Sequence, residues 1–178
     1  MFVILFSLLR VKRRAGVYVL GTGGMIRAHT KENFESACRI NENLTLYPFA
    51  FRTHTHKLGE CAVTGYVVRK GRWTNIGKHS PQEPQMFYPA KKGLKIVKGD
   101  VLAARCTMQN FRDRDTYVGP TGNDEMCNFY IMYYVDGDRI LNDKQCFSYG
   151  PPIYYWHSDP LLRDDLTTKV NEDASTLD

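Results

Sequence analysis

The sequence predicts an all-β fold, an antiparallel jelly-roll β-sandwich. Four stretches are rich in Val, Ile, Tyr and Phe, which favour strands, and Gly, Pro and Asp turns separate them: 16–21, 62–77, 94–108 and 125–135. No helical stripe of useful length interrupts them. Short strands with turns at this spacing are typical of sandwiches and jelly rolls. The chain of 178 residues, 43% of them hydrophobic, suits one such domain.

The N-terminal run "MFVILFSLL" (1–9) is apolar but falls well short of the ~20 residues needed to span a bilayer. It has neither the basic n-region nor the small-residue cleavage site of a secretory signal. Its Phe, Val and Ile favour a strand. Because the basic run "RVKRR" (10–14) follows, we predict a strand and a solvated linker over residues 1–15.

The remaining elements follow from turn residues. "RKGR" (69–72) predicts a hairpin turn and "KGD" (98–100) a turn before a strand. "KHSPQEPQMFYP" (78–89) has three prolines, which predict an ordered irregular loop. The apolar pattern ends near residue 157. We therefore expect one domain over 16–156 and a mobile tail over 157–178.

One strand carries a row of candidate ligands. "FRTHTHKLG" (51–59) places His54 and His56 two residues apart. Residues two apart in a strand share a face, so Arg52, His54 and His56 would form one row. Two imidazoles can chelate a metal if both stay neutral.

A second row lies in "EMCNFYIMYY" (125–134). Met126, Asn128 and Tyr130 fall on one face of a strand, and the odd-numbered residues between them fall on the other. Placed opposite the first row, Met126 would add a thioether to the two imidazoles. Thioether sulfur favours copper, above all Cu(I), and three protein ligands leave a fourth position open, as a catalytic metal site requires. An arginine beside the metal can bind a carboxylate through two parallel hydrogen bonds.

The same residues have ordinary structural interpretations. An isolated His-x-His is more often structural than metal-binding, and a methionine in an apolar strand more often packs in the core. Asn128 can equally satisfy a turn, and Tyr130 can be an interior aromatic. The other three histidines have no partner at ligand spacing: His29, His79 and His157.

Charge and cysteine content narrow the class of protein. The net charge of +5 is modest, and no basic stripe alternates with aromatics, so nucleic acid is not an expected partner. Five cysteines without a CxxC exclude a zinc ribbon and a thioredoxin-type motif. Disulfides imply an oxidising compartment, which also suits the glycosylation sequon at Asn43.

Four long motifs resemble the catalytic second domain of the peptidylglycine α-hydroxylating monooxygenases, which are type II ascorbate-dependent copper enzymes. They are "FRTHTHKLG", "VVRKGRWTNIGKHSPQEPQMFYP", "KGDVLAARCTM" and "NDEMCNFYIMYYV". The resemblance runs from about residue 8 to about residue 150. It implies an antiparallel jelly roll, the fold already expected.

The resemblance implies roles for both rows. His54, His56 and Met126 match the three ligands of the copper at which oxygen reacts. The residues that hold the carboxylate of the peptide substrate are matched by Arg52, Asn128 and Tyr130.

The resemblance also implies two disulfides. Cys38 is expected to pair with Cys146, and Cys106 with Cys127. Cys61 stands where the family motif has no cysteine, so we expect it to be a free thiol.

The implied activity is hydroxylation of the α-carbon of a C-terminal glycine, the first step of peptide amidation, with copper as cofactor and ascorbate as reductant. Glycine-extended peptides are the implied substrates, in the secretory pathway or outside the cell. The family also has a preceding copper domain, of which only a last strand is expected here, over 2–11. Two rivals stay open: a non-catalytic module that binds copper or peptide, and a cupin-like iron or zinc protein, which needs a carboxylate at the metal.

Overall fold

The computed structural model describes residues 12–164 and 166–177, and for Glu60 and Cys61 the backbone alone. The predicted strand over 2–11 therefore lies outside the described residues, as does the expected free thiol of Cys61. The strands are β1 (Arg13–Thr22), β2 (Met25–Ile26), β3 (Lys31–Arg39), β4 (Tyr47–Thr55), β5 (Gly59–Arg69), β6 (Arg72–His79), β7 (Tyr88–Pro89), β8 (Val101–Gln109), β9 (Thr116–Tyr117), β10 (Cys127–Asp136) and β11 (Gln145–Ser148).

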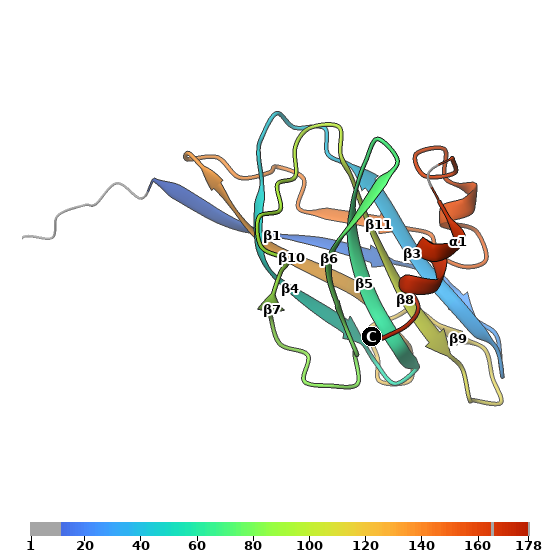
Figure 1. The fold of residues 1–178 in the computed structure, drawn as a ribbon. Coiled ribbons are helices and arrows are strands. Elements are labelled where there is room, and N and C mark those ends of the chain that lie inside the picture. Colours follow the sequence, from blue (N-terminus) through green and yellow to red (C-terminus); the bar gives the residue numbers. More distant parts are fainter. Residues whose placement is uncertain (1–11, 165, 178) are drawn as a thin grey trace, which may run out of the picture.

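Two sheets form the predicted all-β sandwich (Figure 1). One has the order β11-β1-β10-β4-β7 and the other β3-β8-β5-β6. Neighbouring strands within β1-β10-β4-β7 and β3-β8-β5-β6 are antiparallel, and most are distant in sequence, which is the arrangement of a jelly roll. The pair β1–β11 is parallel. Strands β2 and β9 form a separate ribbon.

Strand alternation decides which side chains enter the core. Along β10 the buried residues alternate with half-buried ones, and β4 has the same period from Phe51 to Thr55. Phe129 and Ile131 of β10 pack inward with Phe51 of β4 and Leu102 of β8. The side chains between them consequently face outward from the five-stranded sheet.

Two disulfides tie the sheets together. Cys38 of β3 bonds Cys146 of β11, and Cys106 of β8 bonds Cys127 of β10. These are the pairs that the resemblance implies. Each joins a strand of one sheet to a strand of the other, so both restrain the separation of the two layers.

The predicted turns are present. β5 and β6 form a hairpin in which Lys70 and Gly71 have positive φ angles of 49° and 77°. A turn at 98–100 precedes β8, and Gly99 there has a φ of 94°. The proline-rich stretch is irregular only between β6, which continues through His79, and the short strand β7. The expected linker is shorter than predicted, because β1 already begins at Arg13, whose guanidinium binds Asp136 at 2.8 Å.

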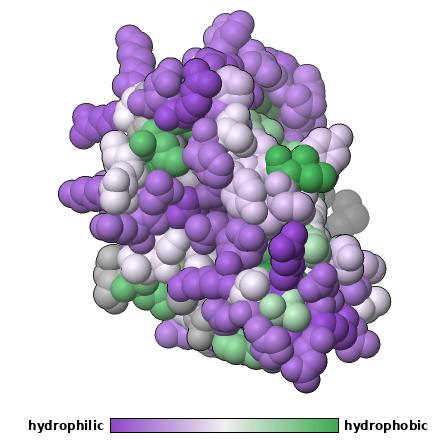
Figure 2. All heavy atoms as spheres, turned by 90° about the vertical axis from the view of Figure 1, so that its right-hand side faces the viewer, coloured by the Kyte–Doolittle hydropathy of each residue, from purple (hydrophilic) through white to green (hydrophobic). Residues whose placement is uncertain are grey.

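The C-terminal stretch differs from the expected mobile tail. It contains a 3₁₀ turn, η1 (Trp156–Ser158), and a short helix, α1 (Thr168–Asp173). Trp156, Leu162 and Ala174 are each 0% exposed and form a second apolar cluster on the outer face of the four-stranded sheet. The outward side of this region is mostly hydrophilic, with small separate apolar patches (Figure 2). The few apolar residues that anchor the segment make no recognisable period in the sequence.

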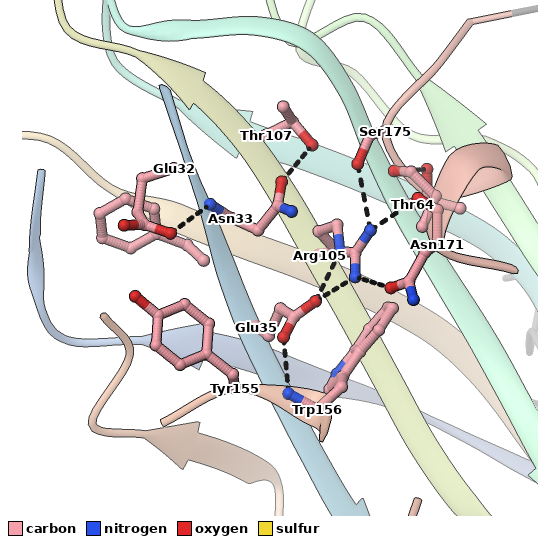
Figure 3. A network of polar contacts seen from close by, with 12 residues as sticks. Glu32, Asn33, Glu35, Thr64, Arg105, Thr107, Tyr155, Trp156, Asn171 and Ser175 are labelled. Atoms are coloured by element: carbon pink, nitrogen blue, oxygen red, sulfur yellow. Dashed lines mark hydrogen bonds and ion pairs between the residues drawn. The ribbon is translucent and has the colours of Figure 1, made fainter. Parts of the chain in front are cut away.

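A buried ion pair holds the same segment (Figure 3). Glu35 and Arg105 are cross-strand neighbours on β3 and β8, each side chain 3% exposed. The Arg105 guanidinium also donates to the backbone oxygen of Asn171 at 2.8 Å and lies 4.5 Å from the ring of Trp156. Glu35 accepts from the Trp156 backbone N–H at 2.6 Å. Charges this deeply buried need such partners, and here the C-terminal segment supplies several of them.

Candidate functional site

The two predicted rows lie side by side on neighbouring strands. β4 and β10 pair antiparallel, with Asn128 opposite His54 and Tyr130 opposite Arg52. All four side chains are half-buried, as are those of His56 and Met126. Because these positions alternate with core residues, both rows face outward from the five-stranded sheet. The register therefore brings the six candidate side chains to one face.

The two histidines stand close together, with their outer ring nitrogens available. Their ring centroids are 5.5 Å apart, and the planes are inclined by 81°. Nδ1 of His54 contacts the side-chain oxygen of Gln85, and Nδ1 of His56 lies 3.1 Å from the backbone oxygen of Asp124. Since both contacts are oxygen acceptors, each Nδ1 carries the proton. Each Nε2 then presents a lone pair, the form in which histidine binds a metal.

Gln85 cannot present its nitrogen to His54 without losing two hydrogen bonds. Its side-chain N–H₂ donates to the backbone oxygens of Thr55 and Pro81, both at 2.9 Å. This arrangement turns the amide oxygen toward the ring of His54. The proline-rich loop thus fixes both the tautomer and the orientation of one candidate ligand.

Met126 supplies the third candidate donor. Its sulfur lies 3.9 Å from the side-chain nitrogen of Asn128, the residue opposite His54. Within the described part of the chain, no three His, Cys, Asp or Glu residues converge as a metal cluster. Two imidazoles and a thioether fit copper, and they leave out the carboxylate that a cupin-like centre needs.

A second group of side chains adjoins these donors. The Arg52 guanidinium carbon is 5.3 Å from the centre of the Tyr130 ring, and its Nε donates to the backbone oxygen of Gln85 at 2.8 Å. These contacts fix the plane of the guanidinium, whose Nη atoms can bind a carboxylate through two parallel bonds. The Asn128 amide lies 3.5 Å from the Tyr130 hydroxyl, so both polar groups adjoin the same place.

Sequence patterns missed three residues that position the site. Gln85, Asp124 and Glu125 contact the two histidines or the backbone beside them. Gln85 belongs to the proline-rich loop, and the other two come directly before Met126. Asp124 acts through its carbonyl, which carries no side-chain signal. The only sequence signal for this segment is the polar turn that comes directly before the row beginning at Met126.

The remaining histidines lie elsewhere. His79 stacks on Tyr88 with 3.9 Å between ring centroids, His29 binds Asp113 at 2.8 Å, and His157 stacks on Tyr155. None of these contacts involves a residue of the two rows.

Comparison with known proteins identifies the family of the chain. Residues 13–159 match the model of the copper type II ascorbate-dependent monooxygenases, C-terminal domain. The chain belongs to this family. The match covers β1 to η1 and therefore both candidate rows.

Similar full-length proteins are known from vertebrates. The chain is 46% identical over 121 residues to peptidyl-glycine alpha-amidating monooxygenase A of Xenopus laevis, covering 67% of this chain and 13% of that protein. Form B of the same species is 47% identical over 121 residues, with 67% and 14% covered. The Mus musculus protein is 48% identical over 111 residues, with 60% and 11% covered. The chain thus spans about an eighth of the length of its Xenopus relatives.

Proposed function

We propose that this domain carries the substrate site and the oxygen-reacting copper of a peptidylglycine monooxygenase. The observation that carries the proposal is the pairing of β4 with β10. It brings two imidazoles and a thioether to the same sheet face as an arginine, an amide and a phenol. Membership of a copper- and ascorbate-dependent family supports the choice of metal and of reductant.

In this proposal His54, His56 and Met126 hold the copper, the first two through Nε2. When bound, the copper supplies the one-electron chemistry by which dioxygen attacks a C–H bond. The thioether favours Cu(I) and so helps to keep the metal reducible. The hydrogen bonds from Nδ1 of both rings leave Nε2 as the atom that faces the metal and hold each ring in a fixed orientation.

The chain's own part in the reaction is to position the substrate. Arg52, with Asn128 and Tyr130, would bind the C-terminal carboxylate of a glycine-extended peptide. Two rigid strands then hold the α-carbon of that glycine beside the metal donors, and such positioning accounts for a large part of many enzymatic rates. One oxygen atom enters the α C–H bond. The other leaves as water, after two electrons and two protons have been taken up.

The proposal includes a partner and a location. The reaction takes two electrons, whereas this site would hold one copper, so the family's preceding copper domain is the proposed partner. A secretory or extracellular location suits the two disulfides. Asn43 is exposed in a bend between β3 and β4, where a glycan could be attached. No helix of the described residues is long and apolar enough to cross a membrane.

The test is an oxygenation assay with copper, ascorbate and the chain combined with a first copper domain of the family. We expect a glycine-extended peptide to gain one oxygen atom by mass spectrometry. The matched peptide with an amidated C-terminal glycine lacks the carboxylate and should react far less.

Arg52→Gln should raise KM for the glycine-extended peptide while leaving Cu(I) binding unchanged, because Arg52 holds substrate and is no metal ligand. Absence of product in the complete mixture would overturn the enzymatic proposal. The chain would then be better described as a non-catalytic module that binds copper or peptide.

A further inference from the structure

Glu125 is a fully buried carboxylate directly beside the candidate metal ligands. Its exposed fraction is 0%. Oε1 accepts the backbone N–H of His56 and, at 2.8 Å, that of Met126. Oε2 accepts the backbone N–H of Leu58 at 2.6 Å. One side chain therefore binds the backbone of two candidate ligands that flank different strands, His56 after β4 and Met126 before β10.

These hydrogen bonds lie just beyond the end of the β4–β10 ladder, where no ladder hydrogen bonds hold the two backbones together. The β4–β10 ladder ends with the pair Thr55–Cys127. His56 and Met126 each lie one residue beyond that pair, whereas His54 is inside the ladder opposite Asn128. Ladder hydrogen bonds thus fix the backbone of His54 but not the relative position of His56 and Met126. The Glu125 carboxylate bridges this gap.

The backbone of Glu125 is itself held in place by hydrogen bonds. The backbone N–H of Glu125 donates to Tyr117 at 2.9 Å, and its carbonyl accepts from Gly119 at 3.0 Å. These bonds attach Glu125 to the end of β9 and to the segment that follows it. The preceding residue, Asp124, supplies the carbonyl that fixes Nδ1 of His56. Residues 124–126 thus provide a ring contact, a backbone brace and a thioether in succession.

We infer that Glu125 is a positioning residue that sets the separation of His56 and Met126 before the metal binds. This inference rests on the proposed copper site, and it concerns how the chain builds that site. A carboxylate with three backbone donors holds its geometry without metal, because removing it would leave buried N–H groups without acceptors. The site is consequently assembled by folding, with copper joining a geometry that already exists.

The test measures Cu(I) affinity by competition with a chromophoric chelator, together with the sulfur signal in X-ray absorption. In Glu125→Gln one carboxylate oxygen becomes an N–H₂ group, which cannot accept a hydrogen bond from the backbone N–H groups that face it. We expect affinity to fall roughly 10- to 100-fold, the range seen for residues that orient metal ligands, and the Cu–S signal to weaken. Glu125→Asp keeps the charge but shortens the side chain, so its loss should be smaller.

Glu42→Gln is the matched control. Glu42 also accepts two backbone N–H groups, from Asn142 and Asp143, and it binds Arg139 at 3.1 Å, away from the two rows. This variant should lose stability but keep the Cu(I) affinity and the sulfur signal of the parent chain. Circular dichroism establishes that each variant is folded at the temperature of the titration.

The outcomes separate two failures. If the parent chain shows no Cu(I) bound through sulfur, the proposed function fails and the inference fails with it. If the parent chain binds and both Glu125 variants bind equally well, only the positioning role is overturned. Loss of the fold in both variants would also overturn it, because the carboxylate would then hold the sandwich as a whole.

Discussion

The two sheets use their outward-facing polar side chains in opposite ways. On the five-stranded sheet, the rows of β4 and β10 remain half-buried. On the four-stranded sheet, Glu35 and Arg105 are also cross-strand neighbours. The C-terminal segment covers them, and each side chain is only 3% exposed. Strand alternation produces a polar row in both cases. Whether such a row can bind a metal or a substrate depends on whether another segment covers it.

The comparison predicts that the covered row governs stability and the open row governs binding. The largest effect is expected for Arg105→Met, which leaves Glu35 buried without its guanidinium. Breaking a buried pair in this way costs about 3–5 kcal/mol. Urea unfolding should show that loss, while Cu(I) affinity at temperatures where the variant is folded should be unchanged.

Two controls sharpen the result for Arg105. Arg39→Met removes an exposed guanidinium that donates to the Gly99 carbonyl, and it should change stability by less than about 0.5 kcal/mol. The double variant Glu35→Gln, Arg105→Met should recover part of the loss, because no uncompensated charge remains. A drop in Cu(I) affinity in Arg105→Met would contradict the separation of the two faces.

A smaller effect is expected for Gln85→Leu on the open face. The variant removes the acceptor at Nδ1 of His54, so Cu(I) affinity should fall roughly 10- to 100-fold. Glu83→Leu is the control, because Glu83 lies in the same loop but its carboxylate contacts His79, which is outside the two rows. Competition titrations of both variants decide the matter. Equal affinities would show that the loop does not orient the ring.

The smallest effect concerns the pH dependence of the covered face. Burial raises the pKa of Asp173, but hydrogen bonds from Tyr66 and Lys78 lower it more, so the net pKa lies below 3.8. A carboxyl group whose pKa is lowered by folding stabilises the folded state at higher pH. That contribution is lost as the pH falls through the folded pKa. Since the side chain is 43% exposed, its loss should cost no more than about 1 kcal/mol.

Tryptophan fluorescence can detect this change. Trp73 and Trp156 are the two tryptophans of the chain, and their ring centroids are 5.0 Å apart in the apolar cluster that anchors the C-terminal segment. Partial release of α1 at acid pH should shift their emission below pH 3.8. Asp173→Asn should reduce the pH dependence of the shift. An identical acid response in the variant would assign the transition to other carboxyl groups.

Sequence predicted the open face better than the covered one, for physical reasons. The alternation in "FRTHTHKLG" and "EMCNFYIMYY" is local, so both rows could be read directly. The pairing of Glu35 with Arg105 joins residues 70 apart in the chain, and "KENFESACR" looks too polar for the strand it forms. The C-terminal segment was expected to be mobile because its anchors, Leu162 and Ala174, are few and widely spaced.

The most direct measurement is an anomalous difference map from crystals of the chain loaded with Cu(I), recorded at the copper absorption edge. We predict one peak, bounded by Nε2 of His54, Nε2 of His56 and Sδ of Met126. The same crystals of Met126→Ile should show that peak strongly reduced. A copper peak at other side chains, or no peak in the parent chain, would contradict the conclusion that β4 and β10 together build a copper site.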